Sequence, residues 1–268
     1  MQITRFAVAA FLAILAASVL ASPGQAFQLL SHRAIYDLSL EPGADSAIHS
    51  VGGRLVIEWA DTCDGYTTEQ RMLMRMGVEN GTIDSDFQFS SWESRDGDQF
   101  RYDVKTTFSG QKPEVFQGRA QRQAETALAT FTKPKGLELE LPEKVVFPSE
   151  HMARMIDKAA SGERQFAMRM FDGTGEEGVF DAVAFILGPA KRELSDPSNK
   201  LTAAMKKAPG WRIQLSFFDL KGGDQMPTYQ VITTLYSNGI SDDLVMKYPD
   251  FSVRGKLAGL MLLPPTGC

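Results

Sequence analysis

Cysteine and histidine are scarce in this chain. Its 268 residues include two cysteines and three histidines, and none of these stands beside another at the spacing of a zinc site. The motifs H-E-x-x-H and G-x-S-x-G are also missing. The sequence therefore indicates neither a metal nor another cofactor, and it contains no motif of a known hydrolytic centre.

Positive charge is not in excess. Lysine and arginine number 28 against 33 aspartates and glutamates, which gives a formal net charge of −5. The basic residues are scattered along the chain, whereas nucleic-acid-binding proteins concentrate them on one surface. Nucleic acid is therefore not an expected partner. The abundant acids single out no pair as a glycosidase dyad.

Long apolar runs are missing except at the N-terminus. Arg5 precedes an uncharged stretch over 6–20, and small residues follow as far as Ala21 and Ala26. This is the layout of a secretory signal peptide. The apolar run of 15 residues is shorter than the roughly 20 that span a bilayer. We therefore expect residues 1–26 to be a signal peptide, cleaved after Ala21 or Ala26, and the mature chain to be exported without a membrane span.

Export changes the interpretation of Cys63 and Cys268. Disulfides form and persist in oxidising compartments, and this chain has no third cysteine to compete. We predict one intramolecular disulfide between these two residues. Two free thiols and pairing between molecules are the alternatives.

Apolar and polar residues alternate through most of the mature chain. Alternation with a period of two is typical of strands with one buried face. Turn-forming stretches such as RDGD at 95–98 and SNG at 237–239 lie between the alternating segments. Counting weaker segments, we expect a mainly β protein with about fourteen strands in an antiparallel sheet that keeps curling round. The clearest segments are 34–40, 54–60, 70–76, 99–105, 137–141, 211–217 and 229–235.

Two segments interrupt the alternation. An amphipathic helix is predicted near 149–161, with Ser149 as its N-cap. A minor helix is predicted near 199–207, within a long polar connection. The apolar face of the first helix is expected to contain Met152, Met155, Ile156 and Ala159, which are spaced as on one side of a helix.

Three features have both a functional and a structural interpretation. The G-x-G-x-x-G pattern at 173–178 is interpreted as a hairpin turn, because a strand pattern follows it where a dinucleotide site requires a helix. Met72, Met74 and Met76 lie on one face of a strand and are candidates for lining an adaptable ligand groove, although core packing is favoured. His151 is interpreted as a partly buried, hydrogen-bonded histidine rather than a catalytic base.

Several stretches together resemble a known family. They are SHRAIYDLSL at 31–40, GGRLVIEWADTCDGYTTEQR at 52–71, FPSEHM at 147–152 and VFDAVAFILG at 179–188, with a cysteine ending the chain. The sequence is similar to the EipB family of alphaproteobacterial cell-envelope integrity proteins. The block T-C-D-G-Y at 62–66 is its most specific element, with Tyr66 where many relatives are expected to have Trp.

The resemblance implies a periplasmic protein whose residues 27–268 form one β-spiral, a long antiparallel sheet wound into an open barrel. It implies that Cys63 and Cys268 form a disulfide that supports function. It also implies a role in envelope integrity and stress resistance. The export signal, the wide alternating sheet, the methionine stripe and the missing catalytic constellation lead us to expect a non-enzymatic protein, with a lipid, a lipid-modified protein or an envelope protein as its partner. The rival hypothesis is a periplasmic hydrolase acting on cell wall or lipid, with His151 in its base system.

Overall fold

The computed structural model describes residues 29–43, 47–124, 126–191, 203–220 and 226–264. These residues contain fourteen strands, two α-helices and one 3₁₀ turn at Gly175–Glu177. The helices are α1 (Pro148–Ala160) and α2 (Ala203–Lys206). The strands are β1 (His32–Leu40), β2 (Ile48–Asp61), β3 (Gly65–Val78), β4 (Gly81–Ser94), β5 (Gln99–Phe108), β6 (Glu114–Gln123), β7 (Thr126–Lys133), β8 (Glu138–Leu141), β9 (Gln165–Phe171), β10 (Val179–Pro189), β11 (Gly210–Asp219), β12 (Tyr229–Tyr236), β13 (Ser241–Lys247) and β14 (Ser252–Leu262).

All fourteen strands belong to one antiparallel sheet, in the order β8 to β1 followed by β14 to β9. Neighbours in this order are neighbours in sequence except at one place, where the first strand pairs with the last. The ladder between β1 and β14 runs from His32↔Leu262 to Leu40↔Val253. This junction joins the N-terminal strands β1–β8 and the C-terminal strands β9–β14 into one continuous sheet.

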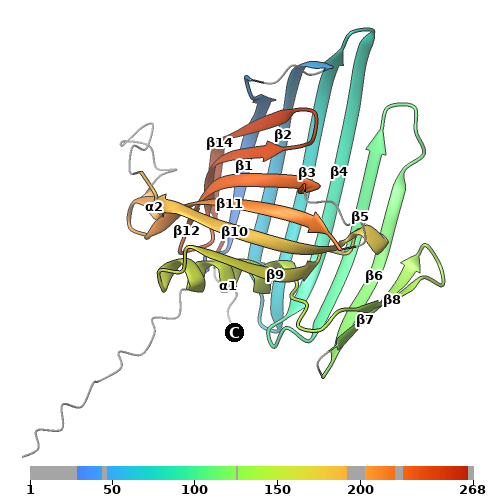
Figure 1. The fold of residues 1–268 in the computed structure, drawn as a ribbon, viewed down its shortest axis with the longest axis vertical. Coiled ribbons are helices and arrows are strands. Elements are labelled where there is room, and N and C mark those ends of the chain that lie inside the picture. Colours follow the sequence, from blue (N-terminus) through green and yellow to red (C-terminus); the bar gives the residue numbers. More distant parts are fainter. Residues whose placement is uncertain (1–28, 44–46, 125, 192–202, 221–225, 265–268) are drawn as a thin grey trace, which may run out of the picture.

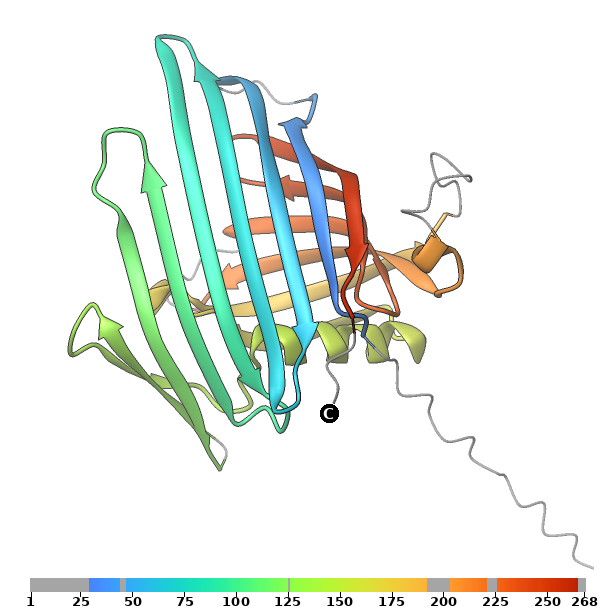
Figure 2. The ribbon, with the colours of Figure 1, turned by 180° about the vertical axis from the view of Figure 1, so that it is seen from behind.

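The sheet winds round so that its two halves face each other, and α1 lies along one end between them (Figures 1 and 2). The right-handed twist of neighbouring strands accumulates over so many strands and curls the sheet. Its two edges approach each other at Val146, which forms an isolated parallel bridge with Met170 of β9. The predicted open, barrel-like antiparallel sheet is therefore confirmed.

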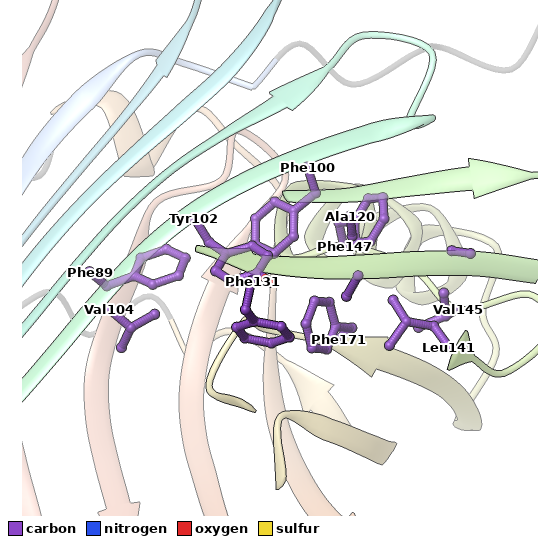
Figure 3. Packing of buried hydrophobic residues seen from close by; sticks show 12 residues of the cluster. Phe89, Phe100, Tyr102, Val104, Ala120, Phe131, Leu141, Val145, Phe147 and Phe171 are labelled. Atoms are coloured by element: carbon purple, nitrogen blue, oxygen red, sulfur yellow. The ribbon is translucent and has the colours of Figure 1, made fainter. Parts of the chain in front are cut away.

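Alternate residues of each strand point into the barrel and form its core. One core cluster joins the two halves: Phe100 and Tyr102 of β5 pack with Phe131 of β7 and Phe171 of β9 (Figure 3). The Phe171 ring meets the Tyr102 ring edge-on, with centroids 5.6 Å apart. Aromatic side chains from distant strands thus hold the two ends of the sheet together.

The two helices lie where the sequence predicted them. The helix predicted near 149–161 is α1, and its Met155, Ile156 and Ala159 are buried. The minor helix predicted near 199–207 is represented by α2, while 199–202 lie outside the described residues. The segment 173–178 is a turn between β9 and β10, so the interpretation as a hairpin turn is confirmed.

Candidate functional site

A small pocket lies inside the barrel beside the N-terminal end of α1, with a volume of about 180 Å³. Its walls come from β1, β2, β3, the start of α1 and the turn between β12 and β13. The ladder pairs His32 with Trp59 across β1 and β2, which brings these two residues to the same inward face. The pocket is lined mainly by apolar carbon, with His32, Tyr36, Ile57, Trp59, Ser149 and Met152 among its residues.

Most polar groups of this pocket are already hydrogen-bonded. The Tyr36 hydroxyl donates to the Ser241 carbonyl at 2.8 Å, and the Trp59 indole N–H donates to the Ser149 hydroxyl at 3.2 Å. Nδ1 of His32 lies 2.7 Å from the Leu30 carbonyl oxygen. A carbonyl only accepts, so Nδ1 carries the proton and Nε2 is an acceptor.

His32 has one ring nitrogen in this wall that is not hydrogen-bonded to any described residue. Its side chain is only 4% exposed, and burial lowers the pKa of its imidazole, which keeps the ring neutral. Among the described residues, no hydrogen-bond partner is found for Nε2. The pocket therefore combines an apolar wall with a few polar groups, among them the Nε2 acceptor of His32 and the hydroxyl groups of Thr68 and Ser241. This arrangement fits an apolar ligand carrying a hydroxyl or amide donor.

The start of α1, which forms one wall of the pocket, is held by a residue distant in sequence. The helix begins at Pro148 after Phe147, whose side chain supplies no cap. Instead the Glu93 carboxylate of β4 accepts the backbone N–H of Ser149 at 2.8 and 3.0 Å and that of Glu150 at 3.4 Å. The prediction that Ser149 is the N-cap was wrong, because a buried carboxylate from the sheet satisfies the free N–H groups of the first turn.

Two buried groups near this helix have strongly displaced pKa values. Burial raises the pKa of Glu93 from 4.5 to about 7, and the hydrogen bonds from Ser149 and Glu150 only partly oppose this. Burial also lowers the pKa of His151 from 6.5 to about 4. The two displacements have opposite consequences for stability as the pH changes.

We expect replacement of Glu93 by glutamine to make folding stability more dependent on pH. Between pH 4.5 and 7 the folded protein keeps the Glu93 proton and the unfolded chain does not, so this group lowers stability as the pH rises. His151 does the reverse between pH 4 and 6.5, because there the unfolded chain binds the proton. The E93Q variant keeps only the His151 contribution of this pair and should gain stability as the pH rises.

The measurement is urea unfolding at intervals between pH 4.5 and 7.5. The Glu93 contribution amounts to about 3 kcal/mol over its window, since each pKa unit corresponds to 1.36 kcal/mol. The H151N variant serves as the opposite control, because it retains Glu93 and should lose stability as the pH rises. Parallel stability profiles for wild type and E93Q would contradict this assignment.

The methionines predicted as groove lining lie on the same inner face, farther along β3. Met74 and Met76 are buried in a cluster with Tyr36 and Leu244, and Met72 packs against it while half-buried. They contribute to the core, as favoured from the sequence. A role for Met72, Met74 and Met76 in contacting a ligand stays a prediction.

Comparison with known proteins supplies the family. The family model described as EipB-like matches residues 23–264. The chain belongs to the EipB-like family. It is 33% identical over 256 residues to the cell envelope integrity protein EipB of Brucella abortus (strain 2308), covering 92% of this chain and 91% of that protein. The resemblance expected from the T-C-D-G-Y block and its companion stretches is thereby confirmed.

A solved structure supports the fold of this family member. The crystal structure of a β-barrel-like protein of the domain of unknown function DUF1849 from Brucella abortus superimposes with a TM-score of 0.80. The two chains are 32% identical, and the match covers 89% of this chain and all of the other. The winding of the sheet is therefore shared with a relative whose structure is known.

The cysteine at the centre of the family block lies in the turn between β2 and β3. The described residues contain no free cysteine. Cys268 and the predicted signal peptide at 1–26 lie outside the described residues, so the pairing of Cys63 with Cys268 stays a prediction. No helix in the described ranges is long and apolar enough to cross a membrane.

His151 is buried in the first turn of α1, with 4% of its surface exposed. The prediction of partial burial was wrong, because the side chain is almost fully buried. The predicted hydrogen bond is not found for Nε2, which has no partner among the described residues. These residues also include no group of three or more side chains placed to hold a metal ion. His151 therefore lies in the packed interior rather than at an accessible reaction centre.

Sequence reasoning did not single out His32, Trp59 or Glu93. The alternation places all three at inward positions of β1, β2 and β4. For His32 and Trp59, this inward position is the sequence pattern that could have identified them. No pattern in the neighbouring sequence predicts the role of Glu93. This role depends on the packing of α1 against β4, and Ser149 of α1 is more than fifty residues from Glu93 in sequence.

Proposed function

We propose that this protein maintains cell-envelope integrity as a non-enzymatic periplasmic protein and that it binds an apolar ligand in the pocket beside α1. The envelope role rests on the relative named cell envelope integrity protein EipB, at 33% identity over nearly the whole chain. The pocket, with its apolar wall and the Nε2 acceptor of His32, is the observation that carries the binding proposal.

The size of the pocket limits what it holds. Sites for whole small-molecule ligands typically measure roughly 300–1,000 Å³, whereas this pocket measures about 180 Å³. It therefore suits the end of an acyl chain that carries an amide or hydroxyl donor, in a lipid or a lipid-modified protein, rather than a complete lipid. The half-buried Met72 lies on the same inward face of β3 as the pocket residue Thr68, in a place to contact a longer chain.

The non-enzymatic part of the proposal rests on the environment of the histidines. A general base has to reach the proton that it removes, and His151 is enclosed by core residues. His32 lines the pocket, but the hydroxyl groups of Tyr36 and Ser149 beside it are each committed to a hydrogen bond within the wall.

Ligand binding is tested by native mass spectrometry of the full mature chain purified from a periplasm. We expect wild type to carry a lipid-sized adduct. Ile57→Phe adds a ring to the pocket wall and should reduce the adduct at least tenfold. Val56→Phe is the matched control, because the adjacent residue faces outward and lines a hollow of the outer surface instead.

An adduct absent from wild type, or retained equally by both variants, would contradict ligand binding here. The envelope role is tested separately by deleting the gene in its host and measuring survival in detergent. Sensitivity that the wild-type gene restores supports the role. Undiminished survival would argue against it.

A further inference from the structure

The outer face of the sheet carries a broad hollow over β3–β7, with a volume of about 940 Å³. Arg101 of β5 and Arg119 of β6 both line it. The two residues are direct partners in the antiparallel ladder, so their side chains leave the sheet on the same face with Cβ atoms about 5 Å apart. Both side chains are exposed.

This arrangement departs from the pattern of the neighbouring strands. On the outer face of β1–β4, each arginine is opposed by an acid from the adjacent strand. In the described part of the chain, Arg101 and Arg119 form no ion pair. The matched pairs are Arg33–Glu58, Arg54–Asp37, Arg71–Asp86 and Arg75–Asp84.

The surroundings of the pair position it, and no acid among the described residues forms an ion pair with it. Asp64 lies nearby, and its pKa is lowered mainly by hydrogen bonds from Thr62 and Trp92, with a smaller contribution from the charge of Arg101. The Arg101 guanidinium lies over the Trp92 ring, 4.8 Å from its centroid, a contact that leaves the N–H donors in the guanidinium plane available. Of the acids that line the hollow, Asp103 accepts a hydrogen bond from Gln117 at 2.9 Å. The other, Glu69, forms no ion pair with either arginine within the described ranges.

Like charges that face each other across a ladder destabilise a sheet. An oxyanion placed between two guanidinium groups would replace that repulsion with charge-assisted hydrogen bonds, for which the planar fork of arginine is well suited. Phosphoryl oxygens match this geometry. The hydroxyl groups of Thr67 and Thr130 line the same hollow and offer further donors.

We propose that Arg101 and Arg119 together bind a phosphoryl oxyanion, supplied either by free phosphate or by the phosphate of a lipid headgroup. The site lies on the outer face of the sheet, opposite to the pocket beside α1. It does not depend on ligand binding in that pocket.

The test compares wild type, R101Q and R119Q with the control R71Q, which removes the same charge from a paired arginine on the same face. Thermal unfolding is followed in sodium phosphate and in sodium chloride of equal ionic strength. Sedimentation with phosphatidylglycerol vesicles, and with phosphatidylcholine vesicles, is the second arm. We expect that either phosphate or phosphatidylglycerol vesicles bind to wild type. That binding should weaken at least tenfold in R101Q and R119Q and persist in R71Q.

Stabilisation by phosphate that is lost in both variants supports a site for the free ion. Binding to phosphatidylglycerol vesicles alone, with the same loss, supports a headgroup site. A third readout is the Tm in chloride, which should be higher in R119Q than in wild type because the repulsion is removed. Equal responses of all four proteins in both arms would overturn the proposal, whatever the result for the pocket.

Discussion

Cys63→Ser and Cys268→Ser are expected to lower the free energy of unfolding by similar amounts, and the double variant by no more than either. A disulfide between these residues closes nearly the whole mature chain into one loop. The chain-entropy model assigns such a loop roughly 5 kcal/mol, as an upper figure. The expected loss is therefore comparable to the net stability of many domains.

The described residues at the C-terminus lie near the strand that precedes Cys63. The Leu263 N–H donates to the Ser31 carbonyl at 2.8 Å, and the Ser31 hydroxyl accepts the Asp61 N–H at 2.9 Å. The last described residues are thus hydrogen-bonded next to the end of β2, two residues before Cys63. The five residues from 264 to 268 can span at most about 17 Å when extended.

The turn that holds Cys63 is itself ordered by hydrogen bonds. The Thr62 N–H donates to the Gly65 carbonyl at 2.8 Å, and Arg95 donates to the Thr62 carbonyl at 2.6 Å. Urea unfolding of the four proteins, with and without a reductant, measures the effect. Reduction should bring wild type down to the level of the variants. Complete alkylation of both thiols in native, unreduced wild type would rule the disulfide out.

Phe171→Ala is expected to destabilise the protein by about 3–5 kcal/mol, the usual cost of removing a buried phenylalanine. The side chain is 0% exposed and contacts Phe100, Tyr102 and Phe131 edge-on. Because Phe171 comes from β9 and its partners from β5 and β7, the cavity would open where the two edges of the sheet meet.

The backbone at this position contributes to the same closure, since the Phe171 N–H donates to the Val146 carbonyl at 3.1 Å. Urea unfolding measures the loss, and hydrogen exchange of β9 should accelerate more than exchange of β2. Phe108→Ala is the matched control, because that ring is 40% exposed at the end of β5 and surface changes usually stay within about 0.5 kcal/mol. Equal losses in both variants would contradict a special role of Phe171 in closure.

Local pattern was sufficient for the elements of this fold. The alternation at 70–76 places Met74 and Met76 inward and Arg71 and Arg75 outward, and the ladders of β3 follow that division. The spacing of Met155, Ile156 and Ala159 similarly defines the buried face of α1. Each of these features depends on neighbours within a few residues, so periodicity reveals it.

Features that join distant segments were decided only by the tertiary structure. The α1 cap is one case, because Phe147 cannot cap the helix and the carboxylate of Glu93 becomes available only once β4 lies against it. The pocket is another, since His32, Trp59 and Met152 meet in it from three separate elements.

The sequence by itself determined the mainly β fold, its strands, its principal helix and its family. The arginine pair illustrates what it left open: alternation places Arg101 and Arg119 outward, but only the register of β5 against β6 makes them face each other. Contacts between residues far apart in sequence likewise determine the pairing of β1 with β14, the closure at Val146 and the pocket that results. Each depends on how the whole sheet twists and winds, which no local pattern of residues encodes.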